Sequence, residues 1–283
     1  LVEAMGAKGM SKSQVSRMAK KLDEQVEAFR TRLLTSAYPY LWLDALYIKV
    51  REAHRVVSKA LLVAYGVNEQ GEREVLDLAV EAGEMEVAWR RFLTRLLDRG
   101  LCGVQLAISD GHVGLKAAIR TVLVGTTWQR CTIHFRRNVF SSVPRNAQDL
   151  VLGAVRTVFQ QTDYESAKVA MGHAIELVEA RYPKAADLMR EAEDDVLAYM
   201  AFPKAHWRQI HSTNPLERLN KEIRRRTRVV GIFPNDDALV RLVGMLLIEQ
   251  NDEWLVGRRY FSLSSMALLE AEALQPPAAL EAL

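Results

Sequence analysis

The sequence has 283 residues, of which 49% are hydrophobic and 26% are charged, and its formal net charge at pH 7 is +3. This composition is ordinary for a globular protein and excludes wholesale disorder. No stretch approaches the roughly 18 consecutive apolar residues that cross a membrane, so we expect no membrane partner. The two cysteines, Cys102 and Cys131, cannot build a disulfide scaffold, so we expect a reducing compartment, the cytoplasm.

Charge is segregated along the chain. Residues 204–228 carry eight basic and two acidic side chains, and residues 128–145 carry four arginines and no acid. Residues 160–200 carry nine acids and four bases. Two basic stretches set against an acidic one can form a face that binds a polyanion such as nucleic acid, although charged runs are also common on solvated helix faces.

Hydrophobic patterning predicts an α/β core in the first half of the chain. Aromatic and β-branched runs predict strands over residues 38–50, 54–67, 72–80, 103–109 and 126–132, with a hairpin loop at 68–71. Apolar residues at three- and four-residue steps predict helices over 11–34, 84–99 (ended by Gly100), 113–122 and from His134 onward. This order indicates a mixed sheet flanked by helices.

Strand signals stop near residue 145, and the second half of the chain reads as helix. We expect helices over residues 147–160, 163–181, 184–200, 215–228 and 235–253, and a fraying, low-complexity tail over 269–283. The predicted organisation is an α/β core interrupted by an all-helical insertion. Its parts are an N-terminal helical segment (1–36), a first part of the core (37–145), the insertion (146–203), a return to the core (204–255) and a C-terminal tail (256–283).

Two aspartates occupy unusual places in the predicted sheet. Asp44 lies inside an aromatic strand, where a charged carboxylate costs several kcal/mol unless something pairs with it. Asp110 follows a buried strand, at the carboxyl end where ligand sites of α/β sheets gather. The ordinary alternatives are a strand-edge aspartate facing water for Asp44 and a turn former or helix cap for Asp110.

A third acid, Glu217, begins a basic helix. Asn214 as N-cap, Pro215 at the first helical position and Glu217 would form a capping box, which is the ordinary alternative. The same helix is predicted to bury one stripe and to expose an acid followed by three bases on the next. The buried stripe is Leu216, Leu219 and Ile223, and the exposed stripe is Glu217, Lys221, Arg224 and Arg228. Together the three acids fit two-metal phosphoryl chemistry, in which carboxylates from different elements share divalent ions roughly 3.5–4 Å apart.

Four motifs resemble those of Mutator-type transposases, and the bacterial insertion-sequence members of that superfamily are the most similar. The motifs are YLWLDA at 40–45, DGHVGL at 110–115, WQRCTIH at 128–134 and TNPLERLN at 213–220. The resemblance runs in order over about residues 10–255, and residues 11–17 resemble the end of the family's N-terminal helix-turn-helix region. It implies an RNase H-like fold with a helical insertion between the second and third acids.

The resemblance implies that Asp44, Asp110 and Glu217 are the DDE triad of a transposase that cleaves and joins the DNA of an insertion sequence. Asp44 and Asp110 would bridge Mg²⁺ ions, with Mn²⁺ as a substitute, and Glu217 would hold the second ion. We expect basic side chains to contact phosphates of the element ends and target DNA, giving affinity without base readout. These are Arg136, Arg137, Lys221, Arg224, Arg225 and Arg228. A homo-oligomer on the DNA and a nucleoid-associated location are expected.

Cys131 and His134 form a CxxH motif that the resemblance places near the catalytic acids without defining its role. A structural zinc would need four ligands, with His206 and His211 as the remaining pair. The alternative is a packed thiol plus a histidine that bonds to the backbone or to a DNA phosphate. His112 either touches DNA or caps a turn, and Trp207 is a candidate for stacking on an exposed base. Two functional alternatives stay open: a non-catalytic DNA-binding relic or regulator, and an RNase H-like nuclease that cuts without joining.

Overall fold

A five-stranded mixed sheet forms the centre of the structure, a computed structural model that describes residues 11–273. The strands are β1 (Tyr40–Glu52), β2 (Arg55–Val67), β3 (Arg73–Glu81), β4 (Leu106–Ser109) and β5 (Thr127–Arg130). They lie in the order β3-β2-β1-β4-β5; β2 is antiparallel to both β1 and β3, and β1, β4 and β5 are parallel. The mixed sheet predicted from the sequence is confirmed.

The hairpin of β1 and β2 is the longest element of the sheet. Thirteen residues of each strand pair in continuous register, from Tyr40 opposite Val67 to Glu52 opposite Arg55. Only Ala53 and His54 connect them, and both have positive φ, at 46° and 65°. A two-residue turn with positive φ at both positions matches the right-handed twist of the strands, so the two strands stay paired up to the turn.

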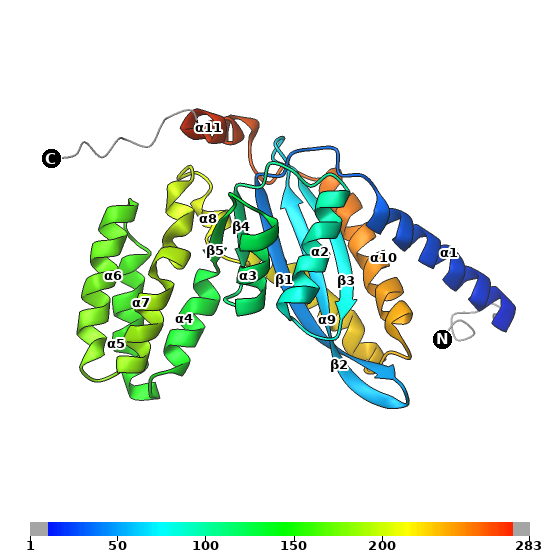
Figure 1. The fold of residues 1–283 in the computed structure, drawn as a ribbon, viewed down its shortest axis with the longest axis horizontal. Coiled ribbons are helices and arrows are strands. Elements are labelled where there is room, and N and C mark those ends of the chain that lie inside the picture. Colours follow the sequence, from blue (N-terminus) through cyan, green and yellow to red (C-terminus); the bar gives the residue numbers. More distant parts are fainter. Residues whose placement is uncertain (1–10, 274–283) are drawn as a thin grey trace.

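Side chains alternate across β1, so the sheet separates two apolar layers. Tyr40 and Trp42 point into one layer and Leu41 and Leu43 into the other, and all four are fully buried. Helices α2 (Glu86–Asp98) and α3 (Val113–Val122) cover the layer that contains Leu41. Helices α9 (Asn214–Val230) and α10 (Asp236–Leu255) cover the opposite layer, and α1 (Lys12–Thr31) packs outside α10 (Figure 1).

A bundle of helices stands beside the sheet, beyond β5 (Figure 1). It contains α4 (Thr132–Ser141), α5 (Gln148–Val158), α6 (Tyr164–Glu179) and α7 (Pro183–Leu197), with short 3-10 turns at Arg145–Ala147 and Ala198–Ala201. The buried amide of Gln129 ties the end of this bundle to β5, because it donates to the Val196 carbonyl at 3.0 Å and accepts from the Tyr199 amide at 2.7 Å. A four-residue helix, α8 (Trp207–Ile210), leads to α9.

The structure departs from the sequence-based elements in two places. β4 and β5 have four residues each, shorter than the expected 103–109 and 126–132. The segment expected as a tail contains α11 (Leu263–Ala273), and Phe261, Met266 and Leu269 are buried in the main core. Residues 1–10 and 274–283 lie outside the described part of the chain. Between residues 11 and 273, no helix combines the length and apolar character needed to span a bilayer.

Helices α1 and α10 cross at a contact that requires a glycine. A Cβ built on Gly244 of α10 would lie 2.5 Å from Cγ1 of Val26 on α1, and Val26 is itself buried. The branched side chain on α1 therefore fits only because the facing position has none.

We predict that Gly244→Ala destabilises the protein by about 1–3 kcal/mol, because the two helices must separate to accept the methyl group. Gly153→Ala is the matched control: Gly153 is an exposed residue inside α5, and a Cβ there meets nothing within 4 Å. That change should stabilise by about 0.5–1 kcal/mol through helix propensity. Urea unfolding of both variants checks the pair, and equal effects would show that the crossing is not tight.

Candidate active site

Asp44 lies on β1 with its carboxylate largely buried. Its Oδ2 accepts a hydrogen bond from Nδ2 of Asn220 at 2.5 Å, and its Oδ1 accepts from the Ala45 amide at 2.8 Å. Burial raises the pKa of this carboxyl to about 6; the negative charge of Asp110 adds to the rise, and the Ala45 and Asn220 hydrogen bonds and His134 oppose it. Asp44 lies just beyond the last residue of β1 that pairs with β4, is partly buried, and lines a cavity.

Asp110 lies beside Asp44 because of the parallel pairing of β1 and β4. Trp42 pairs with Ile108, and each aspartate follows its paired residue by two positions. Asp110 Oδ1 accepts from the Gly111 amide at 2.6 Å and lies 3.8 Å from Nδ1 of His134. The side chain thus makes the expected turn contact while remaining 46% exposed, whereas the N-cap of α3 is His112, whose side chain makes no capping hydrogen bond.

Glu217 lies on the first turn of α9 and is exposed. The N-cap of this helix is Thr213, not Asn214 as predicted, and no side chain makes a capping hydrogen bond there. The capping-box alternative is therefore wrong at its first residue. Glu217 instead lines a cavity together with Asp44 and His134.

The segment that precedes α9 is fixed by three contacts with the core. Trp42 Nε1 donates to the Ser212 carbonyl at 3.2 Å, and the Thr132 amide donates to the His211 carbonyl at 3.1 Å. The amide and hydroxyl of Thr213 both donate to Sγ of Cys131 at 3.3 Å. We call residues 211–213 with these contacts the α9 clasp. It positions the helix that carries Glu217 against β1, which carries Asp44.

The cavity that holds Asp44 and Glu217 has a volume of about 600 Å³ and a basic wall. Five of the six basic residues selected from the sequence line it: Arg137, Lys221, Arg224, Arg225 and Arg228. The predicted buried stripe of α9 is also confirmed, since Leu216, Leu219 and Ile223 are at most 2% exposed. A cavity lined by two carboxylates and five basic side chains can receive a polyanion and hold its phosphate near the carboxylates.

The sixth basic residue, Arg136, is not brought to this cavity. Its guanidinium lies over the ring of Phe159, 4.5 Å from the centroid. Burial lowers its pKa, partly opposed by Tyr199. In the geometry described, Arg136 supports the helical bundle.

Cys131 and His134 lie close enough together, and to the two aspartates, for each to shift the other's pKa. Burial acts to raise the pKa of the Cys131 thiol, but hydrogen bonds with His134 and Thr213 outweigh it and lower the pKa. The contact with Cys131 raises the pKa of His134 against the effect of burial, and Asp110 and Asp44 add to the rise. The packed thiol is observed, since Cys131 is buried and accepts from Thr213, whereas Nδ1 of His134 has no hydrogen-bond partner among residues 11–273.

The other two candidate zinc ligands have partners of their own. His206 Nδ1 shares a hydrogen bond of 2.6 Å with the Tyr40 hydroxyl, and His211 Nδ1 shares one of 2.7 Å with the Thr132 hydroxyl. Within residues 11–273, no three His, Cys, Asp or Glu side chains are grouped closely enough to hold a metal ion, so the structure gives a zinc site no support. By the same measure, Asp44, Asp110 and Glu217 are not preassembled as a three-ligand group.

Trp207 is part of the protein interior rather than a free stacking platform. Its indole nitrogen donates to the Phe202 carbonyl at 2.6 Å, and its ring packs edge-on against Tyr199 with centroids 5.5 Å apart.

Asn220 is the site residue that sequence reasoning missed. It holds Asp44, it is only 4% exposed, and its Oδ1 has no hydrogen-bond partner among the described residues. Its position three residues after Glu217, on the same side of a helix, was the available signal.

Comparison with known proteins identifies the class of this chain. The model of the Mutator family of transposases matches residues 1–257, and the chain belongs to this family. The transposase for insertion sequence element IS1081 of Mycobacterium tuberculosis is 46% identical over 272 residues, which cover 96% of this chain and 66% of that protein. The transposase for IS256 in transposon Tn4001 of Staphylococcus aureus is 39% identical, covering 92% of this chain and 67% of its own length.

These relatives are longer proteins, and the chain spans about two thirds of the length of the curated relatives it matches. Among solved structures, the Drosophila P element transposase strand transfer complex overlaps 91% of this chain and 76% of its own, at 11% identity and a TM-score of 0.32. That similarity is too weak to define a shared fold.

We predict that Asp44→Asn stabilises the metal-free protein at pH 8 by about 3 kcal/mol and that the gain disappears near pH 4. The folded pKa of about 6 lies above the unfolded value of about 3.9, so the folded state binds the proton more tightly. Ionised Asp44 therefore costs stability above pH 6, and the cost is lost as the pH falls through this window. Urea unfolding between pH 4.5 and 8 measures the difference.

Asp98→Asn, which makes the same change at an exposed aspartate that ends α2, is the control. A flat profile for Asp44→Asn would contradict the raised pKa.

Proposed function

We propose that this chain is the catalytic part of an insertion-sequence transposase, which cleaves DNA and joins the released 3′ end to a new site in a metal-dependent reaction. One observation carries the proposal: a single cavity is lined by Asp44, by Glu217 and by five basic side chains, four of which share α9 with Glu217. The family membership of the chain and the names of its relatives support it.

The fold we propose is RNase H-like. Its support is a sheet in the order β3-β2-β1-β4-β5, with β2 antiparallel to both of its neighbours. Two acids lie at adjacent parallel strands of this sheet, and the third lies on a helix that follows the helical bundle. Residues from different elements can thus approach one phosphate from several sides.

The donor set fits a divalent cation. Asp44 and Asp110 follow paired positions of adjacent parallel strands and offer two hard carboxylates, and burial, with a smaller contribution from Asp110, raises the pKa of Asp44. Asn220 Oδ1 is a further oxygen with no partner among residues 11–273. We assign Mg²⁺ to Asp44 and Asp110; Glu217, which lines the same cavity as Asp44 but is not grouped with both aspartates among residues 11–273, would hold the second ion. When bound, the metal supplies stabilisation of charge on the attacking and leaving oxygens.

The protein's own residues bind and orient the substrate. Arg137, Lys221, Arg224 and Arg228 contact backbone phosphates, so affinity is independent of base sequence and falls with salt. Asn220 fixes the orientation of the Asp44 carboxylate, and the α9 clasp fixes the helix that carries Glu217. In the first step a water oxygen bonds to phosphorus as the 3′ oxygen leaves and takes a proton. In the second step that 3′-hydroxyl attacks another phosphodiester, which loses its own 3′ oxygen.

We predict that Asp44→Asn and Glu217→Gln each abolish cleavage and joining of DNA that carries the element ends, while DNA affinity changes less than about twofold, because neither carboxylate belongs to the basic wall. A gel assay with Mg²⁺ or Mn²⁺ measures products, and fluorescence anisotropy measures binding.

The wild-type products separate the alternatives. Binding without cleavage by the wild-type chain would favour a DNA-binding relic or regulator, and cutting without joined product would favour a nuclease. Nicking retained by Asp44→Asn would remove Asp44 from the catalytic role.

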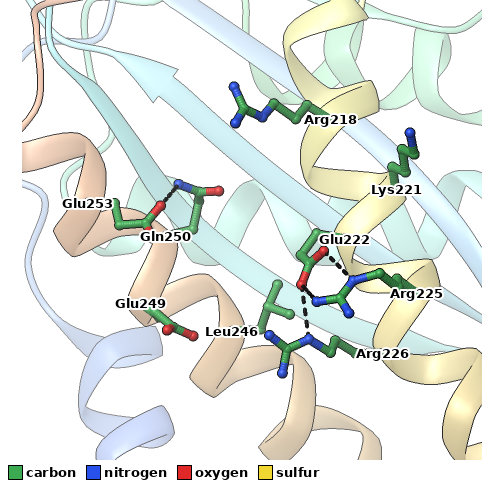
Figure 2. A pocket seen from close by; sticks show the side chains of 9 residues that line it. All are labelled: Arg218, Lys221, Glu222, Arg225, Arg226, Leu246, Glu249, Gln250 and Glu253. Carbon is green, nitrogen blue, oxygen red and sulfur yellow. Dashed lines mark hydrogen bonds and ion pairs between the residues drawn. The ribbon is translucent and has the colours of Figure 1, made fainter.

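Glu222 restrains part of the basic surface. Its carboxylate accepts hydrogen bonds from Nε and Nη2 of Arg225 at 2.8 and 2.6 Å and from Nε of Arg226 at 2.9 Å (Figure 2). These two arginines lower the pKa of Glu222 to about 2, so it is ionised at neutral pH. One acid therefore offsets charge that would otherwise face the substrate.

We predict that Glu222→Gln tightens binding to a duplex of arbitrary sequence by about fivefold and steepens its salt dependence by about one unit of slope, because the freed guanidinium groups meet phosphates. Anisotropy titrations between 50 and 200 mM NaCl measure both. Glu176→Gln makes the same charge change at an exposed site on α6 and should have little effect. If DNA affinity rises equally in both variants, the change in net charge alone is responsible.

A further inference from the structure

A second cavity of about 400 Å³ lies on the other side of α9, between this helix and α10. Figure 2 shows that α9 contributes its basic side chains and α10 contributes Leu246, Glu249, Gln250 and Glu253. Lys221 and Arg225 line both this cavity and the one that holds Asp44. The two cavities are therefore neighbours around α9.

A smaller pocket of about 200 Å³ continues the cavity between α9 and α10 toward β3. It shares Arg218, Gln250 and Glu253 with that cavity, and Arg73 and Trp254 line it as well. A run of connected polar cavities thus leads from the candidate active site around α9 to Arg73.

Arg73 is a partly buried arginine whose guanidinium packs against aromatic rings instead of a carboxylate. Its guanidinium lies between two rings, 4.5 Å from the centroid of Trp254 and 4.7 Å from that of Tyr260. Burial lowers its pKa, and the positive charge of Arg218 contributes in the same direction. No carboxylate of residues 11–273 comes within ion-pair distance of Arg73 or Arg218. Two like charges therefore line one small pocket without an acid paired to either.

We propose that Arg73 and Arg218 form an anion site for a phosphate group, and that its occupant is a backbone phosphodiester of a DNA strand that continues around α9 from the active site. The proposal rests on the DNA-binding function proposed above. The stacked guanidinium is held in one plane, which suits a fork of N–H donors to phosphate oxygens. The amide of Gln250 lies in the same pocket.

One acid borders the site, and it has a partner. Glu253 Oε2 accepts a hydrogen bond from Nε2 of Gln250 at 2.9 Å (Figure 2). With Arg73 and Arg218 against Glu253, the charged residues of the pocket still sum to +1. An anion is therefore favoured over a cation, and the site discriminates by charge and shape rather than by base sequence.

The test uses Arg218→Gln, because Arg218 is exposed and its loss leaves the core intact. Binding to a fluorescein-labelled duplex is measured between 50 and 200 mM NaCl. We expect affinity at 100 mM NaCl to fall about five- to tenfold and the salt slope to decrease by about one unit. Arg73→Lys keeps the charge but loses the planar fork, and should weaken binding with little change of slope.

Two controls frame the result. Arg120→Gln removes an exposed arginine of α3, on the opposite face of the sheet, and should leave affinity unchanged. Arg224→Gln removes a residue of the active-site wall and should weaken binding. If Arg218→Gln behaves like Arg120→Gln while Arg224→Gln weakens binding, the anion site is refuted and the proposed function stands. If the wild-type chain does not bind duplex DNA, the proposed function itself fails.

A second measurement identifies the source of the phosphate. Thermal unfolding is followed in inorganic phosphate and in NaCl of equal ionic strength. Phosphate could stabilise the wild type but not Arg218→Gln, while the DNA affinity of that variant stays unchanged. This result would overturn the DNA assignment in favour of a free phosphate ligand. Loss of DNA affinity in Arg218→Gln, with intact folding, supports the proposal.

Discussion

Asp44 and Asp110 are neighbours because β1 and β4 pair in parallel, and the rest of the candidate site is arranged around this pair of negative charges. Burial raises the pKa of Asp44, and the hydrogen bonds from Ala45 and Asn220 and the nearby His134 offset the rise only in part. A buried carboxylate of this kind lowers the stability of the protein while it is ionised, and a bound cation would relieve that cost.

The basic residues of α9 are distributed over a larger surface than the candidate active site. Helix α9 carries bases on the side of the active-site cavity and on the side of α10, and both sides meet at Lys221 and Arg225. Glu222 and the acids of α10 limit the excess of charge. A surface of this kind attracts a polyanion strongly at low salt while leaving individual contacts weak enough to be exchanged as a strand moves.

The sequence predicted most of the fold because its long apolar strands and amphipathic helices follow clear periods. Five of the six basic residues and the buried stripe of α9 were found because helical spacing places them directly. The remaining features depend on tertiary contacts. Charge gives no sign that Arg136 packs against Phe159 rather than lining the cavity, and the N-cap falls at Thr213 rather than Asn214, where Thr213 contacts Cys131 across the fold. Helix α11 was missed because its burial depends on the surface it meets rather than on its own sequence period.

The helical bundle is fastened at both of its ends to one short region of the core. Gln129 on β5 holds the last turns of the bundle, and Cys131 and Thr132, two and three residues later, hold the clasp that precedes α9. The end of the bundle and the segment that leads from it to α9 are therefore both held by residues 129–132. Helix α4 carries His134 and Arg137 of the cavity that holds Asp44, whereas α5, α6 and α7 carry none of the residues that line it. A change in the length of these three helices need not move β1, the end of β4 or the start of α9, which carry Asp44, Asp110 and Glu217.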